Sequence, residues 1–199
     1  MRLIIIFAIK IFLVLFLISP LTGEEIPVPL DLQAKLLLKI LTFDRNLEKR
    51  ADSAVVVGIV YNPENTDSKK AKSEFSKALE KYSDKKVKGL PVSQIGLKYS
   101  SWAGLLDNIK SYNVSVLYVT SGNSDNLKGV LKASRADSVL TVTGVPKYVE
   151  EGVSIGFGLK ENKPEIIVNL SSAEAEGADF SSQLLKLAKV IKSSGSIDQ

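Results

Sequence analysis

The motif with the clearest chemical potential is Gly152-Val153-Ser154-Ile155-Gly156, which has the G-x-S-x-G spacing of the nucleophile elbow of serine hydrolases. That elbow works because a strand stops, turns sharply and enters a helix, so that the serine hydroxyl is presented at the turn. Here apolar residues alternate with small or polar ones through residues 153–159, which predicts a strand continuing past Ser154. The chain also has no histidine to take the hydroxyl proton. We therefore expect Ser154 to be an ordinary strand residue.

Metal and cofactor chemistry is restricted in the same way. Zinc and copper sites rely on histidine or cysteine, and the chain contains neither. No segment has the alternating acidic or amide residues and glycine of a calcium loop. Glu150 and Glu151 read as a hydrated surface pair, and Gly156-Phe157-Gly158 lies within the predicted strand instead of opening a helix, as a dinucleotide fingerprint would. We predict no catalytic residues, no bound metal and no cofactor.

A basic segment occupies the first half of the chain. Residues 69–88 contain eight lysines against three acidic residues. The aromatic residues Phe75 and Tyr82 fall on the apolar stripe of the predicted helix, so they offer no stacking surface and we expect no nucleic-acid partner. Two interpretations stay open, namely a solvated helix face and a docking surface for an acidic partner.

Polar side chains follow two of the predicted strands at the point where each strand ends. In open parallel sheets, ligands lie beyond the carboxyl ends of the strands, where the strand order reverses. Such a site would collect six residues; the alternative is that they only make turns. The candidate binding residues are Tyr61, Asn62, Asn65, Thr120, Ser121 and Asn123.

The first 23 residues have the parts of an export signal. Arg2 gives a basic start, residues 3–18 are almost wholly apolar with Lys10 as the interruption, and residues 19–23 are polar and helix-breaking. The apolar stretch is shorter than the ~20 residues of a membrane span. We expect cleavage after Gly23 and a periplasmic product; an uncleaved anchor and a buried helix are the alternatives. The absence of cysteine excludes a lipoprotein anchor.

The remaining residues, 24–199, are expected to form a single domain. Loss of Arg2 and Lys10 with the signal would lower the formal net charge from +4 to +2, so the exported chain is nearly balanced. A domain of this size buries enough surface to fold without disulfides.

Helices and strands alternate along that domain, which predicts an α/β fold. We expect a three-layer arrangement in which a mostly parallel sheet is flanked by helices and ends in an antiparallel C-terminal hairpin edge. The hairpin pairs residues 153–159 with 166–170 through a turn at 161–164, and a closing helix capped by Ser181 reaches Ile191. The other expected strands are residues 54–61, 90–97, 114–120 and 138–143, and the other expected helices start near Asp31, Ser68, Ser101, Ser124 and Pro146.

Several blocks of the sequence resemble the YfiR/HmsC-like family. The best match is EIIVNL (residues 165–170) followed by EGADFSSQLLKLA (residues 176–188). It is similar to the family's strand ending in asparagine, then a glycine, a paired serine and a leucine-rich helix. Residues 116–119, 139–144 and 151–157 look like earlier blocks, and the likeness covers most of residues 32–191.

The resemblance implies a function that the residues alone do not. It implies a small, non-enzymatic periplasmic regulator that binds the periplasmic part of a membrane-bound signalling protein. The expected partner is a diguanylate cyclase, whose restraint lowers cyclic di-GMP signalling and biofilm formation. A homodimer is left open. The cysteines that some members use for disulfides are missing here, so redox control is not carried over.

A second resemblance supports an alternative. Residues 57–65, VGIVYNPEN, look like the start of one lobe of a periplasmic substrate-binding protein of an ABC transporter. Such proteins normally enclose their ligand between two lobes, and this chain has room for one. The alternative is therefore a single-lobe solute-binding protein.

Overall fold

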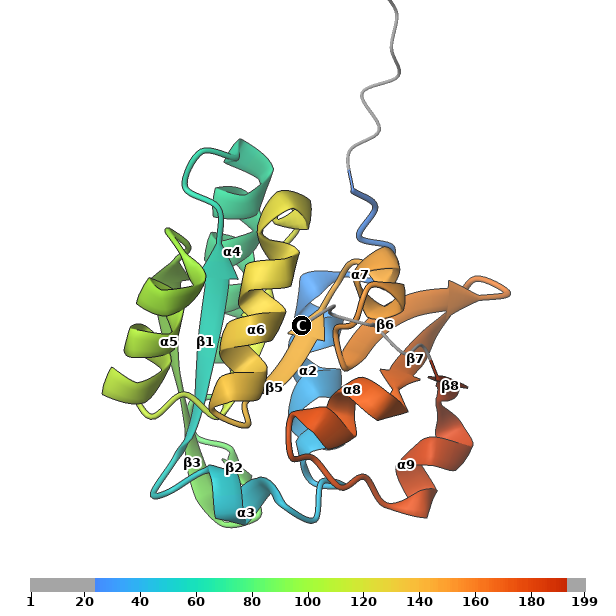
Figure 1. The fold of residues 1–199 in the computed structure, drawn as a ribbon. Coiled ribbons are helices and arrows are strands. Elements are labelled where there is room, and N and C mark those ends of the chain that lie inside the picture. The colour runs from blue at the N-terminus through green and yellow to red at the C-terminus, as the bar shows by residue number, and fades with distance from the viewer. Residues whose placement is uncertain (1–23, 193–199) are drawn as a thin grey trace, which may run out of the picture.

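The sheet is the organising element of the molecule, and the computed structural model describes residues 24–192 around it (Figure 1). In these residues one eight-stranded sheet has the order β2-β3-β1-β4-β5-β6-β7-β8. Neighbouring strands are parallel from β3 through β1, β4 and β5 to β6. Strand β7 is antiparallel to β6, and β8 is parallel to β7. The strands are β1 (Val55–Tyr61), β2 (Lys86–Val87), β3 (Leu90–Lys98), β4 (Val116–Val119), β5 (Leu140–Thr143), β6 (Ile155–Lys160), β7 (Lys163–Asn169) and β8 (Lys189–Ile191).

Helices cover both faces of this sheet, which confirms the predicted α/β layering. Helices α2 and α4 lie on one face, while α5, α6 and α7 lie on the other, nearer the viewer in Figure 1. The helices are α2 (Leu30–Leu41), α3 (Leu47–Arg50), α4 (Thr66–Glu80), α5 (Trp102–Ser111), α6 (Leu127–Ala136), α7 (Pro146–Glu150), α8 (Leu170–Ala175) and α9 (Ser182–Leu187), with a 3-10 turn, η1, at Ser124–Asn126.

Two hydrophobic cores result, because successive side chains of a strand point to opposite faces. In β4, Val116 and Tyr118 join the core under α2 and α4, whereas Leu117 and Val119 join the core under α5 and α6. All four are buried. This is why the central strands read as unbroken apolar runs in the sequence.

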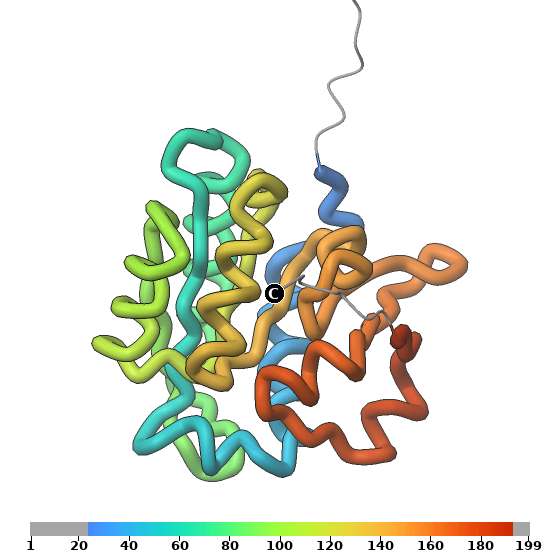
Figure 2. The backbone as a smooth tube through the Cα atoms, in the orientation of Figure 1, coloured from blue at the N-terminus to red at the C-terminus, as the bar shows by residue number. Residues whose placement is uncertain are grey.

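The hairpin is confirmed, with a tighter turn than the sequence predicts. Glu161 and Asn162 alone connect β6 to β7, and both have positive φ, 50° and 61°. That conformation matches the right-handed twist of the two strands, so residues 163 and 164 already belong to β7. The hairpin projects from the body of the chain in Figure 2.

The predicted closing helix is wrong in its second half. Helix α9 ends at Leu187, Ala188 has extended dihedral angles, and residues 189–191 form β8 beside β7. The physical reason is the open edge of β7, whose backbone groups gain partners when the chain runs alongside them. A strand therefore lies beyond the hairpin at this end of the sheet.

Among residues 24–192, no helix combines the length and the apolar character that crossing a bilayer requires. The predicted export signal, residues 1–23, lies outside the described residues.

Candidate functional site at the carboxyl ends of the strands

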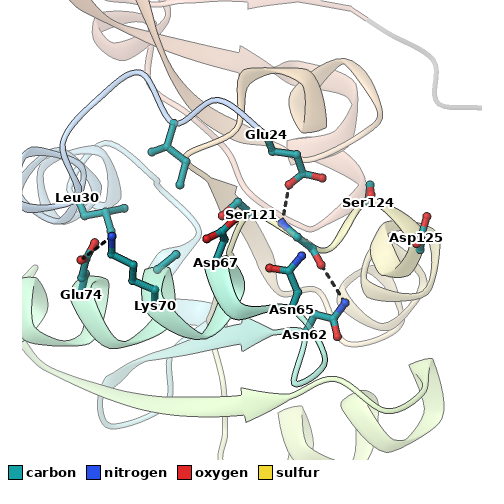
Figure 3. A pocket seen from close by; sticks show the side chains of 13 residues that line it. Glu24, Leu30, Asn62, Asn65, Asp67, Lys70, Glu74, Ser121, Ser124 and Asp125 are labelled. Atoms are coloured by element: carbon teal, nitrogen blue, oxygen red, sulfur yellow. Dashed lines mark hydrogen bonds and ion pairs between the residues drawn. The ribbon is translucent and has the colours of Figure 1, made fainter. Parts of the chain in front are cut away.

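A cavity of about 460 Å³ opens where β1 and β4 end, and three of the six predicted residues, Asn62, Asn65 and Ser121, line it (Figure 3). Its floor comes from the loops after β1 and β4, one side from α4, and another side from the segment that precedes α2. Thirteen residues line it: Glu24, Ile26, Leu30, Asn62, Asn65, Asp67, Lys70, Ala71, Glu74, Ser121, Gly122, Ser124 and Asp125.

Asn62 and Asn65 line the cavity and also hold the turn between β1 and α4. The Asn65 side-chain oxygen accepts a hydrogen bond from the Ser68 amide at 2.9 Å and so caps α4. Asn62 donates from Nδ2 to the Gly122 carbonyl at 3.0 Å, which ties the β1 loop to the β4 loop. Both amide side chains are therefore fixed by backbone partners.

Thr120 and Asn123 are buried behind the cavity and are not among its lining residues. Asn123 Nδ2 donates to the hydroxyl of Thr120 at 3.0 Å and to its carbonyl at 3.1 Å. The Thr120 and Ser68 hydroxyls share a 2.6 Å hydrogen bond, and Thr120 Oγ1 donates to the Val60 carbonyl at 3.0 Å. These two predicted residues support the loops that form the cavity.

The remaining two predicted residues, Ser121 and Tyr61, differ in their position relative to the cavity. Ser121 is largely buried and lines the cavity. Tyr61 is not among the lining residues; its ring lies 5.9 Å from the Lys72 ammonium group. The structure thus brings Asn62, Asn65 and Ser121 together at the cavity and leaves Tyr61 beside it.

Sequence reasoning missed Glu24, which lines the cavity, and Tyr148, which hydrogen-bonds to Glu24. Glu24 Oε2 accepts hydrogen bonds from the Gly122 amide at 2.6 Å and from the Tyr148 hydroxyl at 2.5 Å. That hydroxyl also accepts one from the Asn123 amide at 2.9 Å. Burial raises the pKa of Tyr148, and the hydrogen bond and charge of Glu24 raise it further. No local sequence pattern signals a contact between residues so far apart in the chain.

Gly122 is required by the geometry of this corner. Its φ is +74°, and a Cβ there would lie 2.5 Å from the Asn65 side chain. A left-handed backbone conformation favours glycine, and the close approach of Asn65 favours it again. The β4 loop can therefore approach the β1 loop closely enough for the Asn62–Gly122 hydrogen bond.

The charge of the cavity is mostly negative. Glu24, Asp67, Glu74 and Asp125 line it against Lys70, whose ammonium lies 4.0 Å from Glu74 Oε1. Amide, hydroxyl and carboxylate groups of this kind can hydrogen-bond a small polar solute. Residues 24–192 contain no group of three or more residues that could hold a metal ion.

Ser154 lies one residue before β6 and is fully buried. Its hydroxyl donates to the carboxylate of Glu176, and its amide donates to Thr141 Oγ1 at 3.0 Å. The chain continues into a strand and not into a helix, so the geometry of a nucleophile elbow is absent at this motif.

Two solved structures share this α/β fold. A conserved domain protein from Vibrio cholerae O1 biovar El Tor superimposes with a TM-score of 0.60 at 15% identity, covering 82% of this chain and 60% of its own. The ABC domain in complex with L-Trp from Streptococcus pneumonia gives 0.50 at 16% identity, covering 76% of this chain and 60% of its own. This chain therefore spans about 60% of the length of either structure.

The chain belongs to the YfiR/HmsC-like family. The family profile matches residues 30–189, which takes in every described helix and all strands except the end of β8. The family is one of periplasmic regulators. A search of curated proteins finds no match to this chain.

Proposed function

We propose that the chain is a non-enzymatic periplasmic regulator that binds the periplasmic part of a membrane-bound diguanylate cyclase and lowers cyclic di-GMP signalling and biofilm formation. The observation that carries this proposal is the family match over residues 30–189. The buried position of Ser154 and the absence of histidine and cysteine support a role without bond-making chemistry.

We also propose the form of the mature protein. Residues 1–23 act as a signal that is cleaved after Gly23, and residues 24–199 fold as a single domain in the periplasm. The exported chain then begins at Glu24, the residue whose carboxylate is bonded to Gly122 and Tyr148. Cleavage at this point leaves those hydrogen bonds intact.

A solute-binding role is the second candidate, and the cavity favours it. In this reading, Asn62, Asn65 and Ser121 contact a small polar ligand, Thr120 and Asn123 hold the loops in place, and Tyr61 borders the opening. The fold similarity to an ABC domain that binds L-Trp is in keeping with such a role.

Photo-crosslinking in cells separates the two candidates. A crosslinker placed at an exposed position of the exported chain should capture an integral membrane signalling protein, and the purified chain should show no rise in melting temperature with a panel of amino acids and sugars. A solute binder gives the opposite result, because a ligand that binds only the folded form must stabilise it. A clear thermal shift without a captured membrane protein would contradict the regulator proposal.

A further inference from the structure

One edge of the sheet is open along most of the longest described strand. Strand β2 pairs with β3 only at Leu90 and Pro91, whereas residues 92–98 pair with β1 alone. In residues 24–192 no other strand lies along this side of β3. The open edge sits at the opposite end of the sheet from β8.

The backbone groups that face this edge can be identified. The Tyr99 amide donates to the Tyr61 carbonyl at 3.0 Å, so odd-numbered residues of β3 direct their backbone groups toward β1. Alternation along the strand then directs the amides and carbonyls of Gln94, Gly96 and Lys98 outward. These are the groups that an added strand would pair with.

Both faces beside the edge carry partly exposed apolar side chains. On the α5 face, Ile95 and Leu106 pack against the core without being fully buried. On the α4 face, Val92 and Tyr82 do the same. A strand laid along β3 would cover these side chains as well as pair its backbone, so the edge offers both of the contributions that strand addition uses.

The charge beside the edge selects the kind of strand. Residues 85–106 contain four lysines, of which Lys88 is ion-paired with Glu48 at 3.3 Å, and no aspartate or glutamate. Lys72 of α4 adds a further positive charge, since its side chain lies over Gly96. A second copy of this chain would bring lysines against lysines, whereas an acidic segment would be attracted.

We infer that the open edge of β3, residues 92–98, binds an extended acidic segment of a partner protein by strand addition. This inference rests on the proposed function in that the segment would come from the membrane protein that the chain regulates. The outward amides and carbonyls of Gln94, Gly96 and Lys98 supply the backbone pairing, and the surrounding lysines supply the preference for acidic sequence.

Amide hydrogen exchange with synthetic peptides tests the edge directly. A capped peptide of alternating glutamate and valine, added to the purified protein, should slow exchange of the Gln94, Gly96 and Lys98 amides by about tenfold or more. The inward-facing Ile95 and Leu97 amides are already paired with β1 and should change little. A peptide of alternating lysine and valine is the matched control and should give no protection.

Substitutions at Gly96 sharpen the test. Gly96→Pro removes one outward amide without removing a hydrogen bond to β1, so it should abolish the protection given by the glutamate–valine peptide. Gly96→Ala keeps the amide, and its Cβ meets only the flexible end of Lys72, so it should retain the protection. Circular dichroism of both variants checks that they remain folded.

Three results would overturn the inference. They are no protection by the acidic peptide, equal protection by the lysine–valine peptide, and protection of the edge amides that rises with protein concentration when no peptide is present. Each concerns the edge alone. If a membrane partner is crosslinked but the edge amides are not protected, the proposed function stands and strand addition is rejected. If the edge amides are protected but no membrane partner is crosslinked, strand addition stands and the regulator proposal is rejected.

Discussion

The cavity at the carboxyl ends of the strands and the open edge of β3 differ in how their polar groups are used. At the cavity, Thr120 and Asn123 bond to each other and to neighbouring backbone, and Asn65 caps a helix. At the edge, the outward backbone groups of β3 have no strand beside them among the described residues. Polar side chains near a strand end can thus be occupied in holding the fold, while the edge of a strand keeps backbone groups without a strand partner.

Glu176, a carboxylate deep in the protein, is a further polar side chain that is occupied in holding the fold. It is fully buried and accepts hydrogen bonds from Ser134 Oγ, from the amide and hydroxyl of Thr141, and from Ser154 Oγ. No cation is paired with it in the part of the chain that the structure describes.

The largest effect is expected from Glu176→Ala. This change leaves a buried amide and several buried hydroxyls without their acceptor, so the free energy of unfolding should fall by about 3 kcal/mol. Urea denaturation measures it. Glu176→Gln is the matched control, because it keeps the shape and one acceptor oxygen, and it should cost less. If the alanine variant loses less than about 0.5 kcal/mol of unfolding free energy, these hydrogen bonds contribute little net stability.

The stability of the protein should also depend on pH through Glu176. Burial raises the pKa of this carboxyl above its ordinary value of 4.5, against the lowering effect of its hydrogen bonds. The folded state therefore holds the proton more tightly than the unfolded state, so this contribution is complete below pH 4.5 and is lost as the pH rises through the raised pKa. The unfolding free energy of the wild type relative to Glu176→Gln should fall as the pH rises. A difference that is flat or increases with pH would contradict the raised pKa.

A smaller effect is expected behind the cavity, where Asn123 supports its loops. Asn123→Ala removes hydrogen bonds to the hydroxyl and carbonyl of Thr120, which should lower the unfolding free energy by about 2 kcal/mol. Ser124→Ala, at an exposed residue lining the same cavity, should change it by less than about 0.5 kcal/mol. Equal losses in the two variants would remove the distinction between supporting and lining residues.

The smallest effect on stability is expected at the open edge, where the effect on binding should be largest. Lys98→Glu lies on the exposed side of β3 and should change the unfolding free energy by less than about 0.5 kcal/mol. The same variant should bind the glutamate–valine peptide about tenfold more weakly, because it replaces attraction by repulsion. Titration calorimetry measures the binding. Unchanged affinity would show that charge does not select the added strand.

The sequence predicts the fold class because its periodicities are local. The unbroken apolar run before Tyr61 and the alternation after Gly152 each follow from which faces of a strand are covered. The position of the cavity was also predictable, since parallel strands end at the same side of a sheet. Strand β8 was not, because residues 184–191 fit a helical spacing equally well and only the open edge of β7 decides between helix and strand.

The part of the site that escaped prediction depends on contacts between distant residues. Glu24 meets Tyr148 and Gly122 only after the sheet has formed, and Glu176 becomes buried only when its loop packs onto β5. Glu24 stands in no motif, and Glu176 begins the block 176–188 that resembles the family without its residue type indicating a buried hydrogen-bonding role. Conversely, Thr120 and Asn123 have the residue types of a binding site but face inward, which residue type alone does not reveal.

The most direct test of the regulator proposal is the cellular concentration of cyclic di-GMP in the source bacterium with and without this gene. Deletion should raise the concentration, and expression of the exported wild-type chain should restore it. An unchanged concentration in the deletion strain under every growth condition tried would contradict the proposed role.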